Sequence, residues 1–539
     1  MKTIYFNGNI LTMTHADGQM AMAEAPEALC VKNGKIVAVG SLESVQEKWG
    51  RGARMEDLQG RCLMPGFIDP HGHCALVGQM CLCADLSQCT SFAQIRSTLE
   101  QYIADNSIGP DGVVVGFGYD HNFLEEQAQP DKRVLDQVST QIPIFILHVS
   151  VHLACANSAA MKLAGVDADT PDPEGGIIGR MPGSREPSGY FEEGGMVPLQ
   201  KAVMPLLKVK LSRVLSGVQD KYLRNGVTTI QDGATTQKDL GMLKLMAALG
   251  MLKLDVVAYP MMTSGGEEMM QKNASRCRKY KRHLKIGGYK LVLDGSPQGR
   301  SAWMSQPYLG GEEGYCAYSW LDDETVERYA RIAVAQRQQL LAHCNGDAAS
   351  EQFLNAYEKA VEQEGVTEDL RPVMIHCQTV RNDQLDRMAK LSMIASVFVG
   401  HVWYWGDVHM KNFGPERGNH ISPAADALRR GVHVNFHQDP PVTHPNMLHS
   451  VWCAVNRISR SGNVIGEDQK ISVYDALRAV TVEGAWQYFE EDTKGTLECD
   501  KRADMVILSE SPLEADPMHI RNIRVLQTVK DGKVVYQAD

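Results

Sequence analysis

Long apolar segments are missing from this chain of 539 residues. No stretch approaches the ~20 consecutive apolar residues that a membrane-spanning helix requires. The N-terminal sequence MKTIYFNGNILTM also lacks the basic head, long apolar stretch and small-residue cleavage site of a secretory signal. We therefore expect a protein of the cytoplasm that has no membrane partner.

The chain also has no Cys-x-x-Cys pair and no excess of positive charge. Its 13 cysteines are scattered, and an odd number in a chain of this length indicates reduced thiols, as expected in the cytosol. Lysine and arginine number 54 against 65 aspartate and glutamate residues, which gives a formal net charge of -11. Because nucleic-acid-binding proteins typically concentrate basic residues on one face, this composition favours a small-molecule partner and no nucleic acid.

Both ends of the chain are rich in strand-like segments separated by turns. The segment ALCVKNGKIVAVG turns at Asn33-Gly34, and VLQTVKDGKVVY turns at Asp531-Gly532. Asn-Gly or Asp-Gly between apolar runs is a good hairpin signal. Since chain termini commonly lie close together, we predict one β-sandwich built from residues 1–64 and 486–539. Two separate β-rich appendages are the alternative.

Between these ends, short β-branched apolar runs alternate with helix-like segments. A helical partner is visible in DETVERYARIAVAQRQQ, before the fifth run. Such alternation predicts an α/β fold, and eight runs favour a TIM (β/α)8 barrel over residues 65–485. The gap after the first run is too long for one helix, so we expect an inserted subdomain at 75–205. The runs are 65–73, 225–233, 253–260, 285–296, 338–347, 372–378, 393–401 and 431–439.

A metal-binding pattern begins at His71-Gly72-His73, where the first run ends. His-x-His alone is a weak signal, and a single strand histidine is more often a hydrogen-bonded core residue than a ligand. The signal gains strength because further candidates also end barrel strands, where the chemistry of this fold is built. The predicted ligands are His71, His73, Lys290, His343, His376 and Asp439. Neutral imidazoles with a carboxylate suit one or two divalent ions, Zn2+ first, with Fe2+, Mn2+ and Ni2+ left open.

Lys290 needs a separate explanation, because a cationic ammonium beside a divalent metal would be repelled. Either this side chain points away from the metal, or it is converted to a carbamate, an anionic oxygen ligand that can bridge two metals. The second alternative, an N6-carboxylysine, is the one that we favour.

Several segments of the chain are distinctive when taken together. They are PGFIDPHGH, HLACANSAAMKLAGV, PEGGIIGR, KLVLDGSPQGR, HCNGD, HCQ, QDPPVTHP, ISVYDALRAVTVEGA and KGTLECDKRADMVIL. With them, nearly the whole chain resembles the amidohydrolase superfamily, and more closely the YtcJ-like metal-dependent hydrolases, a group that includes N-substituted formamide deformylase. The resemblance implies a TIM barrel flanked by a composite β-sandwich, and a metal centre of His71, His73, His343, His376 and Asp439. It also places Lys290 where the superfamily often carries a carboxylated lysine.

The chain departs from this pattern at two places. His437-Gln438 precede Asp439 where many relatives have small residues, and CDKRAD replaces the usual Gly-Lys-x-Ala-Asp near the C-terminus. We expect the first difference to alter the pocket and the second to be a change in a surface turn.

The expected reaction is hydrolysis of an amide-like C-N bond in a small N-acyl or N-formyl amine. A divalent metal lowers the pKa of a bound water toward ~7, so metal-activated hydroxide can attack a carbonyl carbon at neutral pH. Asp439 is the predicted catalytic general base, and Asp294 is expected to orient a ligand rather than to bind metal. His152, Arg300 and His401 are candidates for substrate contact. An ordinary hydrogen-bonded histidine or a solvated arginine is the alternative interpretation.

Two other functions are compatible with the same scaffold. A deaminase of this superfamily would be expected to carry Glu three residues after the strand-five histidine, and Gly346 stands there. A non-catalytic regulatory or binding protein would be expected to lose ligands or the base, and all of them are present. The oligomeric state is left open, with a homodimer as the candidate assembly.

Overall fold

The computed structural model describes residues 2–121, 123–149, 153–173, 176–207, 211–310 and 312–538, with the side chains of 79 and 211–216 left out. The chain divides into two compact units. The first consists of Met1–Ala75 and Gln219–Asp539, and the second of Leu76–Val218. Among the helices of the described ranges, none has the length and apolar character required to cross a bilayer.

Parallel strands of the first unit follow one another in chain order, as the apolar runs predict. They are β7 (Phe67–Ile68), β14 (Val227–Thr235), β15 (Asp255–Pro260), β16 (Leu284–Ile286), β17 (Gly288–Val292), β18 (Gln339–Cys344), β19 (Val373–His376), β20 (Ile394–Val397) and β21 (Val434–Phe436). Hydrogen bonds order them as β7-β14-β15-β16 and as β17-β18-β19-β20-β21, with every pairing parallel. The fold is therefore α/β and TIM-barrel-like.

The predicted fourth strand is interrupted at Gly287. β16 pairs with β15, whereas β17 pairs with β18, so the interruption separates the two sheets. A Cβ at Gly287 would lie 2.3 Å from the ring of Tyr259, so only glycine lets the backbone pass this ring. A parallel bridge between Met261 and Lys290 keeps the two sheets in register across the interruption.

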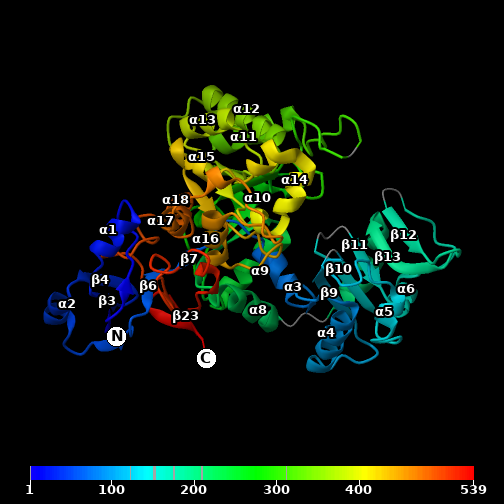
Figure 1. The fold of residues 1–539 in the computed structure, drawn as a ribbon, viewed down its shortest axis with the longest axis horizontal. Coiled ribbons are helices and arrows are strands. Elements are labelled where there is room, and N and C mark those ends of the chain that lie inside the picture. The colour runs from blue at the N-terminus through cyan, green and yellow to red at the C-terminus, as the bar shows by residue number, and fades with distance from the viewer. Residues whose placement is uncertain are drawn as a thin grey trace. The chain divides into compact units, whose positions relative to one another are not determined.

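Helices alternate with these strands along the chain. α11 (Asp323–Ala335) begins at Asp322, whose side chain accepts a hydrogen bond from the Thr325 amide. Val326, Ala330 and Ala333 share one face of this helix by their spacing, and all three are buried. In Figure 1, α11 lies beside α12 (Asp347–Glu364), α13 (Asn382–Lys390) and α15 (Ala424–Arg429) at one end of this unit.

Strands from the two ends of the chain meet in one sheet of the first unit. This sheet has the order β2-β6-β22-β23-β24, and β6 (Cys62–Pro65) pairs antiparallel with β22 (Met505–Leu508). A second sheet has the order β4-β3-β1-β5. Leu29, Leu63 and Met505 belong to one buried hydrophobic cluster that draws residues from both sheets. The remaining strands are β1 (Lys2–Phe6), β2 (Asn9–Ile10), β3 (Ala28–Lys32), β4 (Lys35–Gly40), β5 (Arg54–Asp57), β23 (Val525–Lys530) and β24 (Lys533–Gln537).

The second unit is built on a mixed sheet with the strand order β12-β13-β11-β10-β9-β8. The strands are β8 (Ala84–Asp85), β9 (Val114–Tyr119), β10 (Ile144–His148), β11 (Leu153–Ala156), β12 (Gly176–Arg180) and β13 (Pro187–Glu193). β8, β9 and β10 are parallel, and the others pair antiparallel. Val115 and Phe145 on neighbouring strands contribute to one buried core, and Val114 and Ile146 to another.

Candidate metal centre

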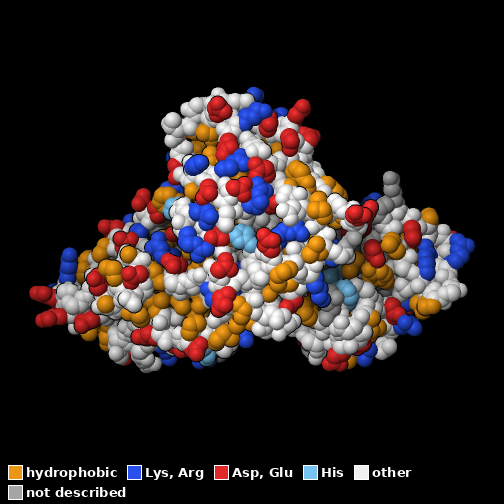
Figure 2. All heavy atoms as spheres, turned by 45° about the horizontal axis from the view of Figure 1, so that its top comes forward, with side chains coloured by type: hydrophobic (Ala, Val, Ile, Leu, Met, Phe, Trp, Pro, Cys, Tyr) orange, Lys and Arg blue, Asp and Glu red, His pale blue; other side chains and the backbone are white. Residues whose placement is uncertain are grey.

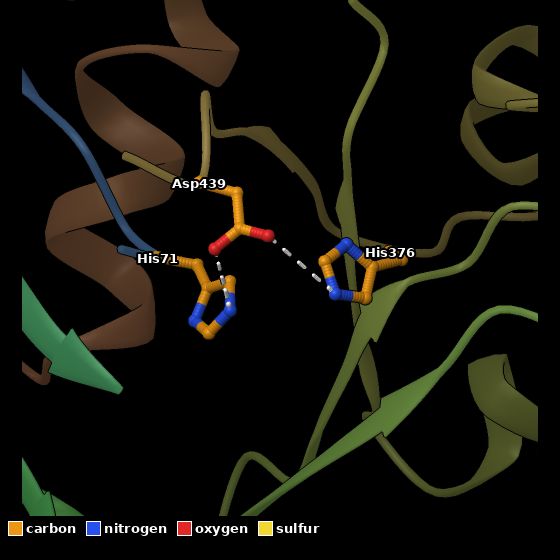
Figure 3. Close-up of side chains that lie close together, drawn as sticks. All are labelled: His71, His376 and Asp439. Atoms are coloured by element: carbon orange, nitrogen blue, oxygen red, sulfur yellow. Dashed lines mark ion pairs between the residues drawn. The ribbon is translucent and has the colours of Figure 1, made fainter. Parts of the chain in front are cut away.

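The Asp439 carboxylate lies against three imidazoles. Its Oδ1 atom is 3.4 Å from Nε2 of His71 and 3.3 Å from Nε2 of His73. Its Oδ2 atom is 4.0 Å from Nε2 of His376. Figure 3 shows the carboxylate between the rings of His71 and His376, and the ligand atoms of these three residues all lie within 4.8 Å of one another. The structure thus brings together residues that the sequence predicts at the ends of three different strands.

The backbone turns sharply at two of these residues. His376, at the end of β19, has a φ of 76°, and Asp439, beyond β21, has a φ of 52°. Positive φ values are uncommon for residues other than glycine, and such conformations concentrate at functional sites. These backbone conformations direct the imidazole of His376 and the carboxylate of Asp439 toward the same point.

Gln231 orients the ring of His71. The Gln231 amide nitrogen donates to the carbonyl oxygen of Pro70 (2.6 Å), so its side-chain oxygen faces Nδ1 of His71, 2.7 Å away. Nδ1 must then carry the hydrogen and donate it, which leaves the lone pair of Nε2 toward Asp439. Sequence reasoning missed Gln231, although a polar side chain inside the apolar run of β14 was an available signal. A Cβ at Gly233 would lie 2.6 Å from His71 Cε1, so glycine there leaves room for the ring.

Asp294 plays the corresponding part for His343. Its Oδ1 atom lies 3.1 Å from Nδ1 of His343 and also accepts the Asn345 amide (3.0 Å), while Oδ2 accepts the Gly346 amide (2.7 Å). This carboxylate is buried, and its hydrogen bonds hold it in place. The His343 ring lies 4.4 Å from that of His376, centroid to centroid. Asp294 thus stands behind a histidine, in the position expected for a residue that orients a ligand.

Lys290 is 1% exposed on β17, and its Nζ atom has no hydrogen-bond partner among the described residues. Burial lowers the pKa of Lys290 to about 7, although the carboxylate of Asp439 opposes this shift. The neutral amine is therefore accessible near neutral pH. A buried amine without a partner is the group expected if a further ligand or a covalent modification completes the site.

Two histidines of the centre, His71 and His376, are held in their neutral form. Burial lowers the pKa of His71 well below its usual value, and Lys290 lowers it further. Burial also lowers the pKa of His376, together with the nearby His343. Burial opposes ionisation of Asp439, yet its contact with His73 keeps the pKa of this carboxyl below its ordinary value. Neutral imidazoles around an ionised carboxylate are the protonation states that bind a divalent cation.

His437 adds a fifth imidazole that the sequence analysis noted only as a departure from relatives. Its ring centroid lies 5.0 Å from that of His71 and 5.1 Å from that of His376. The side chain is buried, and burial lowers its pKa to about 3. A neutral, bulky ring therefore fills the space beside His71 and His376 that a small residue would leave open.

Of the three residues predicted to contact substrate, His152 lies outside the described residues. Arg300 donates from Nε to the side-chain oxygen of Asn412 (2.9 Å) and from Nη1 to the carbonyl oxygen of Gly310 (3.1 Å). These bonds tie its loop to α14 (His401–Asn419), and a role in substrate binding stays a prediction.

The third, His401, begins α14 and is buried. The ring of Phe398 lies 4.8 Å from that of His401 and 6.3 Å from that of His376. The ring of Trp405 lies 4.6 Å from that of His401, with the two planes tilted by 58°. Phe398 thus lies near both His401 and His376, and direct contact of His401 with substrate stays a prediction.

A cluster of histidines with a carboxylate and a buried lysine, at the carboxyl ends of parallel strands, defines a metal-dependent hydrolase. The profile of the amidohydrolase family matches residues 54–536, so the chain belongs to this family and the resemblance in its motifs is confirmed. It is 26% identical to the putative amidohydrolase YtcJ of Bacillus subtilis (strain 168), over 100% of both chains. It is also 26% identical to N-substituted formamide deformylase of Arthrobacter pascens, covering 98% of this chain and 97% of that protein. An uncharacterized metal-dependent hydrolase from Pyrococcus horikoshii has a similar fold, with a TM-score of 0.75 and 23% identity over 96% of this chain and 99% of that one.

Proposed function

We propose that this metal-dependent hydrolase cleaves an amide-like C-N bond in a small N-acyl or N-formyl amine. The observation that carries the proposal is the Asp439 carboxylate, held against the Nε2 atoms of His71 and His73. The similarity to a formamide deformylase over nearly the whole chain supports the substrate class.

The residues present fit a divalent metal. His376 Nδ1 and Lys290 Nζ are buried without hydrogen-bond partners among the described residues, and the imidazoles of His71 and His376 are neutral. His71, His73, His343, His376 and Asp439 would hold one or two ions. Nitrogen ligands with one carboxylate favour Zn2+. When bound, such an ion polarises a carbonyl oxygen and makes water a stronger acid.

Asp439 would move the proton of the reaction. Its carboxylate accepts a proton from the attacking water as the water oxygen bonds to the carbonyl carbon. It then delivers that proton to the leaving nitrogen while the C-N bond breaks, so the products are a carboxylic acid and an amine. The low pKa of Asp439 keeps it ionised and ready to accept at neutral pH.

Lys290 is proposed to be an N6-carboxylysine. Its neutral amine would attack carbon dioxide, losing one proton to give an anionic carbamate. The burial of Nζ without a partner among the described residues, and a pKa of about 7, support this proposal. An unmodified ammonium next to a single metal is the alternative, and it would be electrostatically costly.

A deaminase of the same family is less well supported. Gly346 occupies the position where such an enzyme would be expected to carry Glu. A Cβ at this glycine would lie 1.8 Å from the carbonyl oxygen of Trp303, so no side chain fits there without moving the backbone. The Gly346 amide also donates to Asp294, which orients His343. A non-catalytic regulatory protein is less favoured too, because the ligand candidates and the base candidate are all present.

We also propose that the parallel strands close into a barrel and that the two terminal sheets form a β-sandwich. The His73 amide donates to the Pro440 carbonyl oxygen (2.8 Å), which joins the end of the last strand to the end of the first. Closure would bring the remaining ligands into one ring. A small-molecule substrate agrees with Figure 2, where Lys and Arg side chains are intermixed with Asp and Glu on the face shown.

A product assay tests the proposed reaction. Purified, Zn2+-loaded protein is incubated with a panel of N-formyl and N-acyl amines, and separately with aminated purines and pyrimidines. We expect equal amounts of carboxylic acid and amine from the first panel. Ammonia released from the second panel, without turnover of the first, would replace the proposal with a deaminase.

A further inference from the structure

A second cluster of metal-ligating side chains lies in the unit formed by Leu76–Val218. Asp120 and His121 follow directly after β9, and His148 is the last residue of β10. These strands are parallel neighbours, with Tyr119 paired to His148, so their carboxyl ends meet at one edge of the sheet. None of these three residues belongs to the candidate centre around Asp439.

The three ligand atoms form a compact triangle. Nδ1 of His121 lies 3.2 Å from Nε2 of His148. Oδ1 of Asp120 lies 3.4 Å from the same Nε2 and 3.9 Å from Nδ1 of His121. Zinc bonds of about 2.0–2.2 Å at tetrahedral angles place neighbouring ligand atoms roughly 3.3 Å apart. A cation at the middle of the triangle would therefore reach all three atoms without rearrangement.

The close approach of the two rings also favours a shared cation. If both facing nitrogens carried hydrogen, the rings would repel each other at 3.2 Å. A divalent cation between them accepts electron density from both nitrogens and from the carboxylate together.

The surroundings also suit a cation. The His148 side chain is 6% exposed and that of Asp120 is 15% exposed, so their charges are little screened, while His121 at 30% leaves a route from solvent.

We infer that Asp120, His121 and His148 form a second divalent-cation site. Two imidazoles with one carboxylate favour Zn2+ or a similar borderline ion over Mg2+ or Ca2+, which prefer oxygen ligands. These three side chains would fill three positions of a tetrahedral ion. The inference does not depend on the reaction proposed for the Asp439 centre.

Metal counting on the full-length protein tests this site. Wild type, His121→Asn and His148→Asn are saturated with Zn2+, freed of excess metal and analysed by mass spectrometry. We expect each variant to hold one equivalent less than wild type. Equal zinc content in wild type and both variants, with matching circular dichroism spectra, would overturn the inference.

A matched control separates a three-ligand site from an ordinary His-carboxylate pair. His519 lies 3.2 Å from Glu510 and its side chain is half exposed, so His519→Asn removes one imidazole without touching the cluster. This variant should bind as much zinc as wild type. Because His148 is buried and its variant could fail to fold, anomalous scattering from Zn2+-loaded wild-type crystals gives a second measurement. A zinc peak among Asp120, His121 and His148 is expected, and its absence at full loading elsewhere would contradict the site.

Discussion

His71 donates its Nδ1 hydrogen to the side-chain oxygen of Gln231 across 2.7 Å, and so presents Nε2 to Asp439. Removing a partner that orients a metal ligand typically costs ~10–100-fold in metal affinity. We therefore expect Gln231→Leu to bind Zn2+ about 10–100-fold more weakly than wild type in a competition assay with a chelating dye. Gln46→Leu, on the exposed side of α2 (Leu42–Trp49), is the control. If Gln231→Leu bound Zn2+ with an affinity within twofold of that of Gln46→Leu, Gln231 would not be needed to orient His71.

The carbamate proposed at Lys290 predicts a dependence on carbon dioxide. Apoprotein reconstituted with Zn2+ should recover activity faster in bicarbonate than in chloride of equal ionic strength, because the neutral amine must be carboxylated first. Lys290→Ala should lose most activity and show no difference between the two salts, and short carboxylic acids should restore part of its activity. Density for an unmodified lysine beside one fully occupied metal would contradict the carbamate and leave the hydrolase assignment intact.

A buried group of charges joins β15 to the C-terminal segment. Asp255 Oδ2 accepts from Nζ of Lys494 and from Nζ of Lys530, each at 2.7 Å, and all three side chains are buried. Burial opposes ionisation, yet these two lysines hold the pKa of Asp255 well below its usual value. Removing one partner from such a group leaves uncompensated charge, at a cost of about 3–5 kcal/mol.

Asp255→Asn should accordingly lower the free energy of unfolding by about 3–5 kcal/mol in urea titrations at neutral pH. Glu268→Gln removes one partner of an exposed i,i+4 pair with Lys272 on α10 (Gly266–Lys272), where solvent screens the charges and the expected cost is small. If Asp255→Asn lowered the free energy of unfolding no more than Glu268→Gln does, the buried group of charges would contribute little to stability.

Burial of His409 should account for part of the stability that the folded protein loses at low pH. It is fully buried, and burial lowers its pKa to about 3. In the unfolded chain, the His409 imidazole binds a proton near the ordinary histidine pKa of ~6.5, whereas in the folded chain it does not. The contribution of neutral His409 to the free energy of unfolding is thus fully present above pH ~6.5. It is lost by roughly 1 kcal/mol per pH unit as the pH falls toward the pKa of His409 in the folded chain.

In chelator, so that metal release does not contribute, His409→Gln should show a shallower loss of stability between pH 7 and pH 5 than wild type. His519→Gln, with a half-exposed side chain, should keep the wild-type slope. Equal slopes for all three proteins would mean that the folded state accepts the proton at His409 without cost.

The parallel strands could be predicted because buried strands of this type form continuous apolar runs, and all eight runs contain strands. Positions at strand ends, such as His376 and Asp439, followed from the same pattern. The contact of His71 with Gln231 could not be predicted, since the two residues are 160 positions apart and only the register of β14 beside β7 joins them. The interruption at Gly287 likewise depends on the ring of Tyr259, a contact between strands.

The cluster of Asp120, His121 and His148 could not be predicted from the sequence, for a related reason. Its spacing of 27 positions between histidines has no recognisable motif, and the sequence indicated only an inserted subdomain there. Parallel pairing of β9 with β10 brings the ligands together. The contacts that could not be predicted are therefore those between strands that lie far apart in the sequence, which no local sequence pattern reveals.

Zinc titration of apoprotein, with turnover of an N-formyl amine as the readout, tests the central claim most directly. Activity should rise with bound Zn2+ and disappear again in chelator. Asp439→Asn should retain its fold and much of its zinc while turning over at least ~100-fold more slowly, because its base is missing. Full activity in metal-free wild type, or near-normal turnover by Asp439→Asn, would contradict a metal-dependent hydrolase in which Asp439 moves the proton.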